Sequence, residues 1–395
     1  MKEYSLVLFA ICLTACGAGA RSQSAQPETR GGQGEVEVPR TVVTPRDARS
    51  IPELLRDAAA LTEKQRYREA AAAYDRAYRL EPEGASGDEA VWGAAEAYDQ
   101  LNDHQAALSR FELFAKRQPD SSKGAAALVR ATRLQVFLGR FQPAGLNADR
   151  LLKKLELLNE LAQLSVFSAK ALSLLERDDV QQASYFIEKG REIVDSKRLD
   201  SATVIHRDLA PLYFALGESR RIQAERIKLD PPPPNFGVVF EARCQLLLDA
   251  QSAYADAMRA NDAHWSSIAG YRVAELYQKL HQELLTIRAP PSVITEREKQ
   301  LYEGAVRTRY AILLTKAKAM AEHTLTMATR TGEHSDWVDR TRQALTAIDQ
   351  GIAAEKSALA KLPYTRQDFE AYFAQQEAAA TKAPVPKSPP PKPSR

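Results

Sequence analysis

The sequence contains few of the residues on which catalytic and metal-binding sites depend. It has three cysteines and six histidines among 395 residues. The cysteines do not form a zinc-binding set, and no two histidines have the spacing of a metalloprotease helix. A glycine-rich phosphate loop and a Gly-x-Ser-x-Gly nucleophile motif are also absent from the sequence. We therefore expect a protein that is not an enzyme and that uses no metal or cofactor.

Cysteine is too scarce for a disulfide framework. Cys12 and Cys16 lie in the apolar start of the chain, and Cys244 is far from both. If the start is removed and Cys16 is modified, no internal disulfide can form, even in an oxidising compartment. We predict that Cys244 is a small buried residue and not a reactive thiol.

The chain also lacks an excess of charge and a long apolar run. Its 54 Lys and Arg residues nearly balance 51 Asp and Glu, and four of the basic residues lie between Lys382 and Arg395, where no acidic residue occurs. Removing those four changes the net charge from +3 to −1. This balance gives no reason to expect nucleic acid as a partner. The apolar run 5–16 is shorter than the roughly 20 residues of a membrane-spanning helix.

That apolar run ends in Leu13-Thr14-Ala15-Cys16. An aliphatic residue, two small residues and a cysteine, placed after an apolar segment, resemble the lipobox of bacterial lipoproteins. The resemblance implies that residues 1–15 are a signal peptide and that Cys16 becomes the lipidated first residue. Two or three acyl chains anchor a protein stably, at about 0.8 kcal/mol per buried CH₂. The alternative is a secretory signal cleaved near Gly17–Ala20, which leaves no anchor.

Residues 16–50 follow as a predicted disordered tether, rich in Gly, Ser, Gln, Pro and charge. A coil of this length spans about 30–35 Å. Gly17 stands after the cysteine, where an Asp would resemble an inner-membrane retention signal. The expected location is therefore the cell envelope, at the periplasmic face of the outer membrane.

Two tandem segments, 51–83 and 88–120, share one pattern of small, aromatic and proline residues. Four residues of the first recur 37 positions later in the second: Ala70, Tyr74, Ala77 and Pro82 become Ala107, Phe111, Phe114 and Pro119. In the first helix of the second unit the matching positions are Ala94, Ala95 and Tyr98. The pattern resembles the tetratricopeptide repeat (TPR), which implies antiparallel helix pairs with an aromatic residue between units.

Weaker versions of the pattern follow at 125–158, 164–197 and 203–236, and each is predicted to be a helix pair. The run Pro231–Pro234 should end the array, because no helix contains four prolines. The predicted fold class is therefore all-α, a TPR-like solenoid of helical hairpins over residues 51–236.

Longer apolar stripes predict a separate C-terminal helical module over residues 237–362. Helical periodicity runs through 240–258 and 265–284, and two further helices are expected at about Thr295–Thr329 and Asp336–Leu362. The module either stacks on the array or forms its own bundle. Residues 363–395 are predicted to end in an extended Pro- and Lys-rich tail.

A candidate partner-binding groove lies on the first helix of the second unit. Trp92, Glu96 and Asp99 stand at i, i+4 and i+7, on one helix face. The first helices of a solenoid line its concave surface, where an aromatic beside two carboxylates suits a basic or aromatic segment. The alternative is that Trp92 packs between neighbouring units.

The lipobox, tether and helical repeats together resemble TPR lipoproteins of myxobacterial envelopes. The resemblance implies a lipid-anchored periplasmic scaffold that binds envelope proteins or peptide segments and takes no small-molecule substrate. A pilotin-like chaperone for an outer-membrane secretin or another client is the alternative. An enzyme acting on cell-wall polymer is a third, which no spacing of carboxylates favours.

Overall fold

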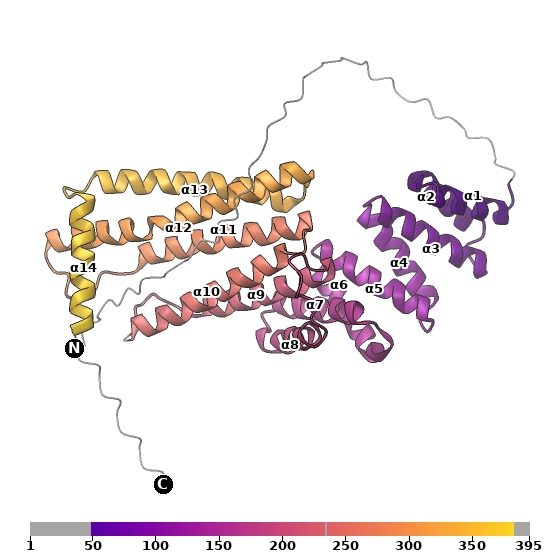
Figure 1. Cartoon of the computed structure of the whole chain (residues 1–395), viewed down its shortest axis with the longest axis horizontal. Helices are drawn as coiled ribbons and strands as arrows, with labels where there is room; N and C mark the ends of the chain where they lie inside the picture. Colours follow the sequence, from indigo (N-terminus) through magenta and orange to yellow (C-terminus); the bar gives the residue numbers. More distant parts are fainter. Residues whose placement is uncertain (1–48, 234, 383–395) are drawn as a thin grey trace, which may run out of the picture.

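The structure is a computed structural model that describes residues 49–233 and 235–382 (Figure 1). The predicted signal peptide, the lipidation site Cys16, most of the tether and the Pro- and Lys-rich tail lie outside the described residues. Every regular element within them is a helix, so the predicted all-α class is confirmed.

The first nine α-helices cover the region predicted as repeats. They are α1 (Ile51–Glu63), α2 (Tyr67–Leu80), α3 (Gly84–Gln100), α4 (His104–Arg117), α5 (Ser122–Phe137), α6 (Phe141–Leu151), α7 (Glu160–Glu176), α8 (Val180–Lys197) and α9 (Ala210–Arg226). The short 3₁₀ helices η1 (Leu152–Leu157) and η2 (Arg207–Leu209) join α6 to α7 and precede α9. The remaining helices are α10 (Phe236–Met258), α11 (Ala263–Thr286), α12 (Glu296–Thr331), α13 (Asp336–Ala360) and α14 (Arg366–Lys382).

The first four helix pairs turn in the same way. One residue with a left-handed backbone lies in each turn, and these residues are Gln65, Asn102, Gly139 and Asp178. The first three are 37 residues apart, which is the offset of the sequence pattern. The repeated turn places the two helices of each pair antiparallel, as TPR units require. The helix pairs predicted from 51–83, 88–120, 125–158 and 164–197 are therefore confirmed.

Short polar side chains fix the start of many helices. Each accepts a hydrogen bond of 2.9–3.1 Å from the backbone N–H three residues further along. These residues are Asp103, Ser121, Asn159, Asp179 and Asp262. A cap of this kind satisfies an amide that has no partner inside the helix.

The aromatic residues of the repeat fill the space between units, as the pattern predicts. A Cβ added to Gly93 of α3 would lie 2.4 Å from the Tyr74 ring of α2, so the ring rests directly on the α3 backbone. Phe111 of α4 is fully buried in a cluster that includes Ala127 and Ala131 of α5. Small residues on one helix and aromatics on the next thus set the spacing of the stack.

The fifth predicted unit, 203–236, is not a helix pair. It contains η2 and the single long helix α9, and α9 pairs with α10 instead. The proline-rich stretch does interrupt the helices, but the chain then turns back, and α10 packs along α9. The hydrophobic cluster with the most buried residues extends from Val129 of α5 to Leu276 of α11 and includes residues on both sides of position 236. The C-terminal helices therefore stack on the array, which is one of the two arrangements expected, and one core crosses the predicted boundary at 236/237.

The packing of α9 on α10 is close and is reinforced by buried charge. A Cβ on Gly217 would lie 2.5 Å from the ring of Tyr254, which is fully buried. The Tyr254 hydroxyl donates to Glu218, 2.5 Å away, and Arg221 and Arg272 lie 2.8 and 3.0 Å from the same carboxylate. Burial tends to raise the pKa of Glu218, but the two arginines lower it overall. The carboxylate therefore stays ionised and joins α9, α10 and α11.

The C-terminal helices form an antiparallel stack (Figure 1). α12 and α13 occupy the ranges predicted for them, and Thr295 caps α12 through a capping box with Glu298. None of the helices in 49–233 and 235–382 is both long and apolar enough to cross a bilayer.

The structure extends the C-terminal module beyond the predicted end at Leu362. α14 follows and crosses the ends of the long helices, with Phe369 and Phe373 buried beside α12 (Figure 1). A Cβ on Gly304 would clash with the Phe369 ring. The two phenylalanines are four residues apart, so a single turn of amphipathic helix was enough to extend the core.

Substitution of Gly217 tests whether α9 and α10 share one core. Gly217→Ala should lower the free energy of unfolding by about 1–3 kcal/mol, because its methyl group overlaps the Tyr254 ring. Gly351→Ala is the control, since its Cβ would lie an ordinary 3.5 Å from Leu314. It should raise stability by about 0.5–1 kcal/mol through helix propensity. Urea unfolding followed by circular dichroism measures both, and equal effects would contradict the close packing.

Candidate functional site

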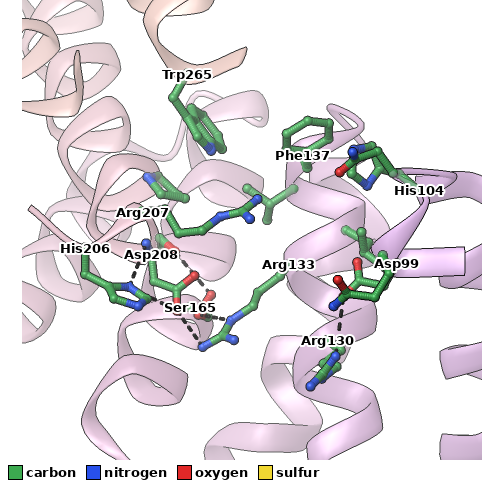
Figure 2. Close-up of a pocket in the computed structure, with 16 residues that line it drawn as sticks. Asp99, His104, Arg130, Arg133, Phe137, Ser165, His206, Arg207, Asp208 and Trp265 are labelled. Atoms are coloured by element: carbon green, nitrogen blue, oxygen red, sulfur yellow. Dashed lines mark hydrogen bonds and ion pairs between the residues drawn. The ribbon is translucent and has the colours of Figure 1, made fainter. Parts of the chain in front are cut away.

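A cavity of about 480 Å³ lies where the repeats meet η2 and α11 (Figure 2). Its walls come from α3, α4, α5, α7, η2 and the start of α11. Both the repeat array and the predicted C-terminal module therefore contribute to it. The lining combines three arginines, two histidines and two aspartates with the aromatic rings of Phe137 and Trp265.

One wall is an irregular segment fixed by the arginine that directly follows α10. Arg259 donates hydrogen bonds to the carbonyls of Asp200 and Ala202, at 2.7 and 2.6 Å. The Ile205 N–H donates to the carbonyl of Arg259 at 3.1 Å. These bonds place the following residues, His206 and Arg207, at the cavity.

A stack of three rings closes another side. Phe137 lies between His104 of α4 and His264 of α11, with ring centroids 4.3 and 3.9 Å from its own. Phe137 and His264 are nearly parallel, at 23°. Trp265 follows and packs against Phe214 of α9. Through this stack, α11 contacts the second and third repeat units.

Burial favours the neutral form of both histidines in this stack. Burial lowers the pKa of His104, although Asp99 raises it and Arg207 lowers it further. Burial also lowers the pKa of His264, against the opposing effect of Glu333, 3.5 Å from its Nδ1. His104 Nδ1 and His264 Nε2 are buried and accept or donate no hydrogen bond. Protonation of either ring would therefore place a charge in an unfavourable site.

The three arginines differ in how fully they are paired. Arg133 donates to the Ser165 hydroxyl at 2.8 Å and lies 2.9 Å from the Asp208 carboxylate. Arg130 lies 3.3 Å from Asp99. Within residues 49–233 and 235–382, Arg207 has a single ion pair, a long one of 3.7 Å, and its side chain is 62% exposed.

The structure separates the three residues of the predicted groove. Trp92 packs edge-on against Phe111 and Phe114, with centroids 5.8 and 5.1 Å away. Both rings belong to α4, in the same unit as Trp92, and the role of Trp92 in a groove stays a prediction. Glu96 and Asp99 share Arg130 at 3.8 and 3.3 Å. Of the three, only Asp99 lines the cavity, so we place the candidate site at the cavity.

The arginines that line the cavity were not predicted from the sequence. Arg130 and Arg133 stand at i and i+3 in the third unit, which lacks the aromatic residue of the repeat pattern. This pair of arginines was a usable signal. Arg207 lies in an irregular segment whose position depends on Arg259, more than 50 residues later. No local pattern indicates such a contact.

Cys244 is buried, as predicted, and burial raises the pKa of its thiol to about 11. No group of three or more His, Cys, Asp or Glu side chains in the described part of the chain is placed to hold a metal ion. The expectation that the protein is not an enzyme stays a prediction.

No protein-family model matches this chain, and no curated protein matches it. The solved structures that are similar to it include the following two. A tetratricopeptide repeat protein from Parabacteroides merdae is 15% identical, with a TM-score of 0.39, over 75% of this chain and 98% of that one. The human IFIT1 dimer with m7Gppp-AAAA is 14% identical, with a TM-score of 0.38, over 85% of this chain and 73% of that one. The likeness concerns the helical fold alone, and the TPR-like description rests on the helix pairs above.

Acidification tests the ring stack. The folded pKa values of His104 and His264 lie below the ordinary value of 6.5. The unfolded chain therefore binds protons first, and stability should fall as the pH drops below about 6.5. His264→Phe preserves the stacking but cannot titrate, so its Tm should fall less between pH 7.5 and 5.5.

The control is His323→Phe, at an exposed position of α12. It should lose as much Tm on acidification as the parent protein. If His264→Phe loses as much as the control, the stack does not sense pH.

Proposed function

We propose that this protein is a non-enzymatic scaffold that holds a segment of a partner protein in the cavity between α5, η2 and α11. The observation that carries the proposal is the cavity itself, whose volume of about 480 Å³ is in the range that accommodates several side chains of a ligand. It is concave, open to solvent and built from rigid helices.

The lining suits a peptide. Guanidinium groups of Arg133 and Arg207 donate hydrogen bonds, whereas Asp99 and the Asn102 amide oxygen accept them. An extended peptide offers both an N–H and a carbonyl at each residue. Phe137 and Trp265 add apolar surface for a side chain.

The proposed place of action is the cell envelope. The support is the sequence Leu13–Cys16, whose lipobox pattern implies a lipid anchor, and the polar residues after it. A lipid on Cys16 would attach the protein to the periplasmic face of the outer membrane. The tether to residue 50 would then let the cavity reach envelope proteins a few nanometres away.

A pilotin-like chaperone is the second candidate. The same anchor favours it, and the same cavity could hold a client segment during transport to the outer membrane. The two functions differ in the lifetime of the complex. Deleting a scaffold should dismantle a stable assembly, whereas deleting a chaperone should mislocalise one client.

Cys16→Ala tests the anchor. The parent protein should partition with detergent-solubilised membranes and show the mass of a lipidated Cys16 in mass spectrometry. The Cys16→Ala protein should appear in the soluble fraction. A parent protein without lipid on Cys16 would rule out the anchor but would leave the cavity proposal intact.

Site-specific photocrosslinking tests the cavity. A benzophenone amino acid replaces Gln100, an exposed residue at the cavity wall, in the full-length chain expressed in its own cells. The control position is Tyr185 on α8, which is 59% exposed and does not line the cavity. We expect a crosslinked partner from Gln100 and not from Tyr185. Equal crosslinking at both positions, or none at Gln100, would contradict the proposed site.

A further inference from the structure

We propose that the segment bound in the cavity carries an acidic side chain, and that Arg207 is the residue that pairs with it. This inference rests on the proposed function, because it specifies the chemistry of the partner at the same site. It also reverses the sequence prediction, in which carboxylates of α3 would attract a basic segment.

The carboxylates of α3 already have a cationic partner within the chain itself. Arg130 of α5 lies beside both Glu96 and Asp99. Lys123 places its ammonium group 4.7 Å from the centre of the Trp92 ring, where a cation of the partner was expected. A basic segment would have to displace these two side chains before it could bind.

The lining itself carries more guanidinium groups than carboxylates. Three guanidinium groups face two carboxylates in the lining, those of Asp99 and Asp208. Burial lowers the pKa of His104, so it adds no charge at neutral pH. Glu96 and Asp262, beside the lining, pair with Arg130 and Arg207 only at 3.8 and 3.7 Å. An anionic group of a partner can therefore compete for a guanidinium whose own carboxylate lies at such a distance.

Arg207 has the greatest unused capacity to bind an anion. Arg133 is occupied by Ser165 and Asp208, and Arg130 by the two carboxylates of α3. The Arg207 guanidinium makes no hydrogen bond within the described residues. Its one ion pair, 3.7 Å to Asp262, is to a carboxylate that already accepts the Trp265 N–H at 3.1 Å as a helix cap. A guanidinium whose N–H groups make no hydrogen bond within the described residues is well suited to a bidentate carboxylate.

The Arg207 side chain also lies where a bound segment could contact it. Figure 2 shows its side chain reaching from η2 across the opening, toward the helix that carries Arg133 and Phe137. Trp265 lies above it in the same view. Phe137 and Trp265 line the same cavity and offer apolar surface near the guanidinium. The preferred segment thus places an apolar side chain next to its acidic residue.

The same lining disfavours nucleic acid. A phosphate backbone presents acceptors only, and Asp99, Asp208 and Asp262 all lie at or beside the cavity. Their carboxylates would repel consecutive phosphates. A peptide with one acidic residue meets Arg207 with its carboxylate and these acceptors with its N–H groups.

The test begins with a selection on the full-length chain from a random library of 12-residue peptides. We expect the enriched sequences to contain Asp or Glu beside an apolar residue. Fluorescence anisotropy then compares an enriched peptide with its amide form, in which Asp or Glu becomes Asn or Gln. The acidic peptide should bind about tenfold more tightly than the amide form.

Arg207→Gln should remove that tenfold difference by weakening the acidic peptide alone. The matched control is Arg342→Gln on α13, whose side chain is similarly exposed, at 57%, and pairs with Asp339 outside the cavity. It should leave both affinities unchanged. Because Arg207 is exposed, its replacement is not expected to unfold the protein, and circular dichroism verifies this.

Several outcomes would overturn the inference. Enrichment of basic or uncharged peptides would do so, as would an equal effect of Arg207→Gln on the acidic and amide peptides. Binding of a labelled single-stranded oligonucleotide that depends on Arg207 would point to a different polyanion. If a partner crosslinks at Gln100 but the peptides show no preference for acid, the scaffold function survives and the acidic chemistry does not.

Discussion

The contact of α9 with α10 at Gly217 and Tyr254 is the constraint on which the rest of the structure depends. The missing side chain of Gly217 lets the tyrosine ring lie on the α9 backbone, and its hydroxyl reaches Glu218. A buried carboxylate is stable only with full compensation, which Arg221 and Arg272 supply. Since Arg272 belongs to α11, three helices are fixed by one charge. This joint makes the TPR-like array and the long C-terminal helices a single body.

The cavity is a consequence of that joint. With α11 fixed against α9 and α10, its first turn places His264 on Phe137 and Trp265 beside Phe214. Arg259, at the end of α10, fixes the segment that carries Arg207. The concave side of a solenoid is usually an open surface. Here the chain itself covers one end of it, so a ligand would touch both halves of the molecule at once and would be sensitive to their relative position.

The arginines differ in how closely a carboxylate of the chain pairs with them, and this difference distinguishes a structural role from a binding role. Most arginines of the core and the cavity have carboxylate partners within about 3 Å, and their role is to satisfy buried groups. Arg207 differs, because its partner is distant and already used as a helix cap. A surface ion pair of that kind contributes little to stability. An arginine that stabilises little and faces a concave site is available for a ligand, and this is why the proposed chemistry depends on it.

Local pattern was sufficient for much of the fold. The 37-residue offset of Tyr74 and Phe111 predicted the first repeat units. Apolar periodicity and the Thr295 cap predicted α12. Both signals act within one helix or between neighbouring helices. The sequence also carries Leu13–Cys16, whose resemblance to a lipobox stays a prediction. Tertiary structure decided the rest. One core crosses residues 236 and 237, because the pairing of α9 with α10 depends on packing and not on the proline-rich stretch between them. Lys123 and Phe114 lie against Trp92, and this contact joins residues from three helices. The cavity arose only when Arg207, Phe137 and His264 met, and long-range packing alone brings them together.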